Sequence, residues 1–170
     1  DLQRTMSDVV RAFRPGQNSF LTRLVSGQRV DKILFAATKA DHLHHRQHVN
    51  YTNIMRAIMD DALRHAKFRG AQTAALSLAS VRSTTEALHE GHPCVRGTLL
   101  SSRKNTLSYA GSLPENAQQL LRDISDGRSN WLGAEFTSTP FAPPLDAFHP
   151  DRGIAHIRLD QSLECLLGDR

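Results

Sequence analysis

The sequence is poor in cysteine and in long apolar runs, and each shortage excludes a class of protein. Only Cys94 and Cys165 are cysteines, and their separation fits no metal-binding or redox spacing. No apolar run approaches the length of a membrane span, so we expect no membrane-spanning segment. No cationic, apolar leader marks a secreted precursor, and we therefore expect reduced thiols and a cytoplasmic location. Because the first residue is Asp1 and not methionine, we expect part of a longer polypeptide.

The charge balance is basic, but basic residues are not clustered. The 21 lysines and arginines against 17 acidic residues give a net charge of +4 and a pI of about 9.5. The arginines are scattered through every segment, and aromatic residues make up only 6% of the chain. Nucleic-acid-binding surfaces usually show basic clusters with interleaved aromatics. We therefore expect a solvated basic surface and no nucleic-acid partner.

The first half of the chain has the pattern of a parallel-sheet protein. Residues 30–37 contain the apolar run ILFAA, which is typical of a strand buried on both faces. Residues 50–68 carry apolar side chains at helical spacing, and residues 71–79 form a second apolar segment. Helices are also predicted over 6–13 and 18–25. Strand, helix and strand at this spacing predict a βαβ unit with parallel strands.

The second half of the chain has the pattern of loops, a hairpin and short helices. CVRGTLL and NTLSYAG flank the polar stretch SSRK, which predicts an antiparallel hairpin. A short helix is expected over 117–124, and four of the seven prolines fall within 137–150, which predicts loop. At the end we expect a strand followed by a helix that Asp160 caps, with its leucines buried. The predicted fold class is α/β: a parallel-sheet portion followed by a loop-rich segment with a β-hairpin.

Polar residues at the ends of the two predicted strands suggest a guanine pocket. Thr38, Lys39 and Asp41 follow the first strand, and ligands of open α/β sheets bind at such strand ends. A carboxylate has two coplanar acceptors that match guanine N1–H and N2–H₂, while the lysine stem can lie across the base. This is the logic of the [N/T]-K-x-D motif of P-loop GTPases. The alternative is that Lys39 and Asp41 are ordinary solvated loop charges.

The second predicted strand ends in LASVRST, where such GTPases carry their second base loop. We expect a backbone N–H of Ser80 or Val81 to meet guanine O6. Further along, Ser83 and Glu86 have the spacing of a capping box, which predicts the start of a short helix.

Four histidines follow the candidate base motif and raise the question of a metal. They are His42, His44, His45 and His48. No carboxylate or cysteine within this stretch completes a familiar ligand set, and neither H-E-x-x-H nor H-x-H-x-D-H occurs. We therefore expect loop histidines near the nucleotide and no metal site.

The segments DKILFAATKADHLHHRQH, LSLASVRSTTEA and HIRLDQSLECLLGDR resemble the YcjX family, a bacterial group of stress-associated P-loop NTPases. The resemblance spans nearly the whole chain. It implies a Ras-like GTPase core that binds GTP or GDP with Mg²⁺. Carried over by position, it makes Thr38, Lys39 and Asp41 the base-specificity motif, and Ala79, Ser80 and Val81 the second base loop.

The chain departs from the family pattern in two ways. Thr38 stands where asparagine is commoner, and no two glycines have the spacing of the phosphate loop G-x-x-x-x-G-K-[S/T]. In the family the phosphate-binding elements lie upstream, so we expect an upstream part of the same polypeptide as a partner. Residues 1–92 would be the carboxyl-terminal half of a Ras-like domain, 93–153 an insertion, and 154–170 the closing elements. GTP hydrolysis would belong to the full-length protein. The alternatives are a non-catalytic partner-binding module and a histidine-based metal protein.

Overall fold

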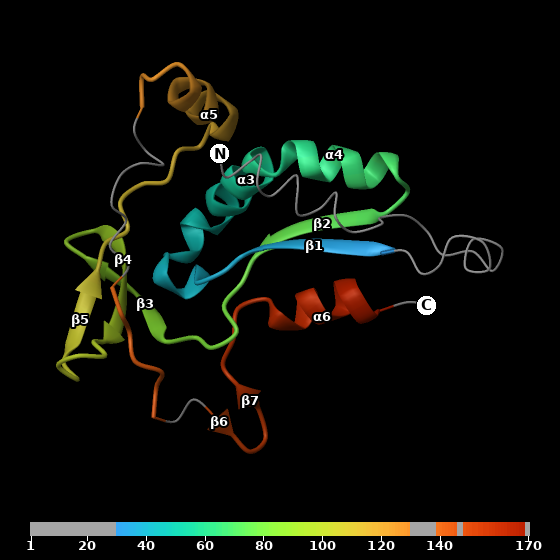
Figure 1. The fold of residues 1–170 in the computed structure, drawn as a ribbon. Coiled ribbons are helices and arrows are strands. Elements are labelled where there is room, and N and C mark those ends of the chain that lie inside the picture. Colours follow the sequence, from blue (N-terminus) through green and yellow to red (C-terminus); the bar gives the residue numbers. More distant parts are fainter. Residues whose placement is uncertain (1–29, 130–138, 146–147, 169–170) are drawn as a thin grey trace.

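A two-stranded parallel sheet forms the centre of the computed structural model, which describes residues 30–129, 139–145 and 148–168. Strand β1 (Lys32–Ala37) pairs with β2 (Gln72–Ser77), with Phe35 opposite Ala75. The parallel pairing of the two apolar segments is confirmed (Figure 1). The helices predicted over 6–13 and 18–25 lie outside the described residues.

Helices cover both faces of this sheet. On one face lie α3 (His48–Ile58) and α4 (Asp60–Phe68), and α6 (Leu159–Leu167) lies on the other (Figure 1). On the α3–α4 face, Phe35 packs in a core with Met59, Ala62, Ala66 and Ala71. The single helix predicted over 50–68 is therefore two helices, which meet at the non-helical backbone of Met59.

A three-stranded antiparallel sheet stands beside the parallel one. It consists of β3 (Thr84–His89), β4 (His92–Thr98) and β5 (Asn105–Ser108), so the predicted hairpin is confirmed as β4–β5. The capping box predicted at Ser83 is wrong, because the segment that follows it pairs as a strand with β4. Glu90 and Gly91 both have positive φ and form the tight β3–β4 turn. The expected boundary at residue 92 lies inside this sheet.

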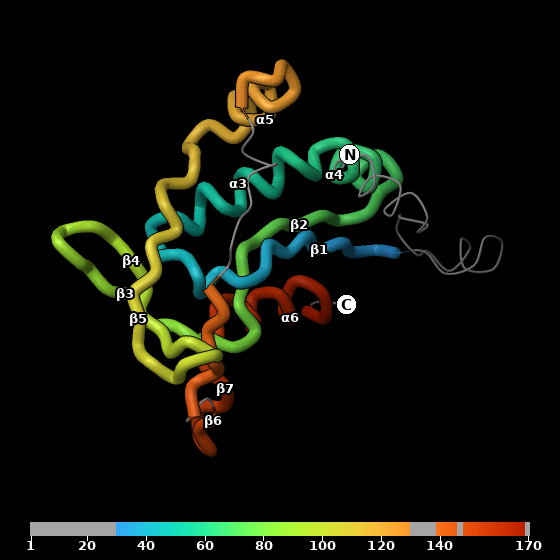
Figure 2. Tube along the Cα trace, turned by 60° about the vertical axis from the view of Figure 1, so that its left-hand side comes forward, coloured from blue at the N-terminus to red at the C-terminus, as the bar shows by residue number. Residues whose placement is uncertain are grey.

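The remaining elements pack around these two sheets. The predicted short helix is present as α5 (Ala117–Ser125), which Asn116 caps and which lies beside α3 (Figure 2). Its side chains Ala117 and Leu120 pack on α3. Residues 139–142 lie against β4, where the ring of Phe141 fills the space that a side chain at Gly97 would need. The short strands β6 (Phe148–His149) and β7 (Gly153–Ile154) form a small hairpin.

The closing helix differs from its prediction in two respects. The N-cap of α6 is Arg158, in the left-handed conformation, and Asp160 lies in the first turn. The leucines expected to point inward are exposed, namely Leu163, Leu166 and Leu167, and Ser162 is the buried residue of the helix. Among the described residues, no helix has the length and apolarity to cross a membrane. The described fold is mixed α/β, with one parallel sheet and two antiparallel sheets.

Candidate functional site

The loops that follow β1 and β2 remain joined beyond the ends of the strands. The amide of Leu78 donates to the Ala37 carbonyl at 2.9 Å, and the amide of Ala40 donates to the Leu78 carbonyl at 3.0 Å. Ala40 begins the 3₁₀ turn η1 (Ala40–His42). The two candidate base loops therefore leave the same edge of the sheet as neighbours, as expected for parallel strands.

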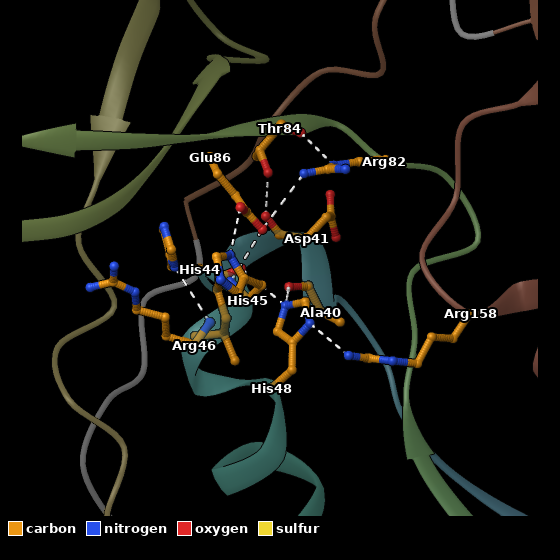
Figure 3. Close-up of polar contacts among 11 residues, drawn as sticks. Ala40, Asp41, His44, His45, Arg46, His48, Arg82, Thr84, Glu86 and Arg158 are labelled. Carbon is orange, nitrogen blue, oxygen red and sulfur yellow. Dashed lines mark hydrogen bonds and ion pairs between the residues drawn. The ribbon is translucent and has the colours of Figure 1, made fainter.

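Asp41 is the residue that ties the two loops together. One carboxylate oxygen, Oδ2, accepts from the backbone N–H of Ser83 at 2.9 Å. The backbone carbonyl of Asp41 accepts from the Thr84 hydroxyl (Figure 3). Asp41 is only 5% exposed. An ionised carboxylate has about four lone-pair sites, so this hydrogen bond orients the group and leaves acceptor capacity for a ligand.

Thr38 and Lys39 stand exposed at the rim of the same loop. Lys39 has φ 60° and ψ 35°, a left-handed conformation that costs a non-glycine residue about 1–3 kcal/mol and that clusters at functional sites. The Thr38 carbonyl accepts from the Tyr51 hydroxyl at 2.9 Å. Burial raises the pKa of Tyr51, which keeps the phenol protonated as a donor.

The second loop divides into a paired and an open part. Ala79 is buried, and its N–H and C=O both pair with Ile157, at 3.0 and 2.9 Å. Its amide is therefore engaged by the segment before α6. Ser80 is exposed and Val81 is half-buried, which leaves these two residues as the positions from which a backbone donor can reach a ligand.

A buried polar network supports the first loop from beneath, and sequence reasoning missed it. Nε2 of His48 lies 2.8 Å from the Ala40 carbonyl and 3.2 Å from that of Leu43, while Nδ1 lies 3.1 Å from Nη2 of Arg158 (Figure 3). Carbonyls only accept and guanidinium only donates, so Nε2 carries the hydrogen and Nδ1 the lone pair. Arg158 also donates to the Ser77 carbonyl and hydroxyl, at 2.8 and 2.7 Å.

The network holds His48 in its neutral form. Burial lowers the pKa of His48 below 6.5, against the hydrogen bonds to Leu43 and Ala40 that raise it. A proton added at Nδ1 would face the Arg158 guanidinium, which also lowers the pKa. No local motif announces this contact, because Arg158 lies 110 positions after His48.

Two further histidines lie beside the candidate base loop and meet an acidic residue from β3. His44 is buried, whereas the side chain of His45 is exposed, and their ring centroids are 4.4 Å apart. Nδ1 of His45 lies 2.7 Å from Oε2 of Glu86. Burial disfavours the charged carboxylate, but the hydrogen bond and charge of His45 outweigh it and lower the pKa of Glu86. His48, by contrast, is committed to the buried network.

Two surface clefts lie away from the base loops. One of about 610 Å³ runs between α3 and the start of α5, and one of about 360 Å³ lies between α3 and residues 109–115. Neither is lined by a residue of the two candidate loops. At the candidate base loops themselves, Thr38, Lys39 and Ser80 are exposed, while Asp41 is buried.

Comparison with known proteins gives one consistent result. The model of the YcjX-like family, DUF463, matches residues 1–170. The chain is 33% identical over 174 residues to "Ras-like GTPase YcjX" of Escherichia coli K12 and 28% identical over 177 residues to the protein of the same name in Shewanella oneidensis. Each match covers all of this chain, but the chain spans only about a third of either relative, 35% and 34%. Because the family model matches from the first residue to the last, the chain belongs to the YcjX-like family.

Proposed function

We propose that this chain carries the guanine-recognition part of a Ras-like GTPase. The observation that carries the proposal is the hydrogen bond from the Ser83 amide to the Asp41 carboxylate, at 2.9 Å. It joins the TKAD and ASVRST loops and fixes a buried carboxylate where the two meet. The curated relatives are named as GTPases, which supports the same reading for the full-length protein.

Recognition would rest on three groups of this chain. The Asp41 carboxylate accepts from guanine N1–H and N2–H₂, whereas adenine has no such donor pair at that edge. The exposed Lys39 stem lies along the base with its ammonium in water. A backbone N–H of Ser80 or Val81 donates to guanine O6, and Ala79 supports that loop through its pairing with Ile157. The low exposure of Asp41 strengthens the charge-assisted bonds that it makes.

Hydrolysis would require groups that this sequence does not contain. In P-loop GTPases the phosphate loop cradles the β- and γ-phosphates, and Mg²⁺ neutralises charge on them. No residues here have the phosphate-loop spacing, so those contacts would come from the upstream part of the polypeptide. The residues of this chain would bind and orient GTP or GDP through the base alone.

Replacing Asp41 by asparagine tests the proposal. The amide oxygen can still accept from Ser83, but the amide NH₂ then faces a guanine donor and repels it. Losing the charge-assisted pair costs about 2–4 kcal/mol, which corresponds to roughly 30- to 1000-fold weaker GTP and GDP binding. Affinity for the xanthine nucleotide should improve relative to GTP, because xanthine has a carbonyl oxygen in place of the amine.

Calorimetry on the full-length protein gives these affinities. Asp61→Asn is the matched control, because Asp61 lies on α4 with an exposed side chain and undergoes the same chemical change. If Asp41→Asn binds GTP as tightly as Asp61→Asn does, the guanine proposal is wrong.

A further inference from the structure

The fold brings a carboxylate to two of the histidines, and this supplies the ligand that their own segment lacks. Glu86 lies in β3, 41 positions after His45. One candidate ligand atom from each of His44, His45 and Glu86 lies within 4.8 Å of the other two. We propose that these three residues form a binding site for a divalent transition-metal ion, zinc foremost, beside the candidate base loop (Figure 3).

The donor set fits a borderline metal. Two imidazole nitrogens and one carboxylate oxygen are the protein ligands of a common open zinc site, in which water takes the fourth position. Tetrahedral bonds of about 2.0–2.2 Å place ligand atoms roughly 3.4 Å apart. The present separations bracket that value, since Nδ1 of His45 lies 2.7 Å from Oε2 of Glu86 and no pair exceeds 4.8 Å. The exposed side chain of His45 can rotate to open the short contact.

The carboxylate is already oriented for one-oxygen ligation. Its second oxygen, Oε1, accepts from the backbone N–H of His45 at 3.2 Å and lies 3.8 Å from Nη2 of Arg82. These contacts hold Oε1 and leave Oε2 toward the histidine rings. Groups that orient a ligand in this way usually strengthen a metal site. His44 adds rigidity because it is only 6% exposed.

The site would connect the same two chain segments as Asp41 does. His44 and His45 belong to the segment after η1, and Glu86 follows Ser83 by three positions in the β3 segment. A bound ion would therefore be a second tie between those segments. Binding of the ion requires no guanine nucleotide, so it can be measured on nucleotide-free protein.

The test is zinc binding to full-length, metal-stripped, nucleotide-free protein, measured by calorimetry and by elemental analysis after dialysis. We expect about one equivalent of Zn²⁺, with the affinity reduced at least about tenfold in His45→Ala and in Glu86→Gln. His65→Ala, which removes a histidine of α4, should bind as the wild type does. Mg²⁺ should not compete, because it prefers a shell of oxygen ligands.

A thermal-shift measurement provides a second readout, because an ion that binds only the folded protein raises the melting temperature. Zinc should raise it in the wild type and in His65→Ala but not in Glu86→Gln. If the buried His44 does not tolerate replacement, His45→Ala and Glu86→Gln decide the question alone. Binding weaker than roughly 100 μM, or binding that neither variant reduces, would overturn the proposal.

Discussion

Replacing Arg158 by methionine would remove the hydrogen bonds that hold His48 beneath the candidate base loop, without requiring a change in the backbone. Methionine keeps an unbranched stem, and it meets the left-handed conformation of this position at the same cost as arginine. What disappears is the guanidinium, with its hydrogen bonds to the Ser77 carbonyl, the Ser77 hydroxyl and Nδ1 of His48. The effect of the substitution should therefore come from those three contacts.

The magnitude follows from the burial of the partners. Ser77 is 1% exposed and His48 is 3% exposed, so water cannot readily replace the lost donor. Each buried acceptor that is left without a partner costs about 1–3 kcal/mol, and the terms are not additive. We expect a loss of about 3 kcal/mol in the free energy of unfolding. For a chain of this size the melting temperature then falls by roughly 6–12 °C.

Calorimetric and urea unfolding measure this loss, with Arg152→Met as the control. Arg152 is exposed and lies six positions before Arg158, so its replacement should change stability by less than about 0.5 kcal/mol. A double-mutant cycle with His48→Gln should give a coupling energy of about 0.5–3 kcal/mol, because the two side chains are in contact. A loss no larger than that of Arg152→Met, or a coupling energy of zero, would refute the reasoning about this network.

Two further predictions concern pH and packing. Because the folded protein lowers the pKa of His48 below 6.5, the stabilising contribution of His48 is complete above pH 6.5 and is lost as the pH falls below that value. In urea titrations from pH 8 to pH 5, the free energy of unfolding should therefore fall less steeply with pH in His48→Gln than in the wild type. Equal slopes for the two proteins would contradict this prediction. Gly97→Ala should destabilise by about 1–3 kcal/mol, because the added Cβ would lie 2.5 Å from Cδ1 of Phe141. Adding Phe141→Leu to Gly97→Ala should recover part of that stability in thermal unfolding. If it recovers none, the contact with the Phe141 ring is not the cause of the loss.

Elements governed by local patterns were predictable from the sequence. The apolar run before Thr38 and the apolar segment 71–79 identified β1 and β2, and the helical spacing after Asn50 identified α3, because burial against neighbouring elements requires those patterns. The break at Met59 was not predictable, since Met59 is itself buried and continues the apolar stripe. Only the backbone geometry at that residue reveals two helices.

Elements governed by distant pairing were missed. Ser83 and Glu86 match a helix cap locally, but Thr84 and Thr85 pair with β4 and the segment becomes a strand. That change carries Glu86 to His45, a contact that no reading of the histidine segment could supply. The prediction for the leucines of α6 was also wrong. Their helical spacing predicts a buried face, but the described structure leaves them exposed.

The candidate base site itself was predictable to the level of segments. Thr38, Lys39 and Asp41 follow β1, and residues 79–81 follow β2, as the two strand ends indicated. The Asp41 carboxylate contacts the second loop at Ser83 and not at the three residues chosen for that loop. The engagement of Ala79 by Ile157 likewise depends on a segment far along the chain.

The Arg158–His48 contact also has a consequence for the order of events during synthesis. His48 is added to the growing chain 110 residues before Arg158. At about 5–20 residues per second, the interval is roughly 5 to 20 seconds. Throughout that time β1, α3 and β2 can form, but the imidazole beneath Ala40 lacks its guanidinium donor. We expect a nascent chain at this stage to hold the TKAD loop loosely, so the loop would reach its final conformation only when the closing helix docks.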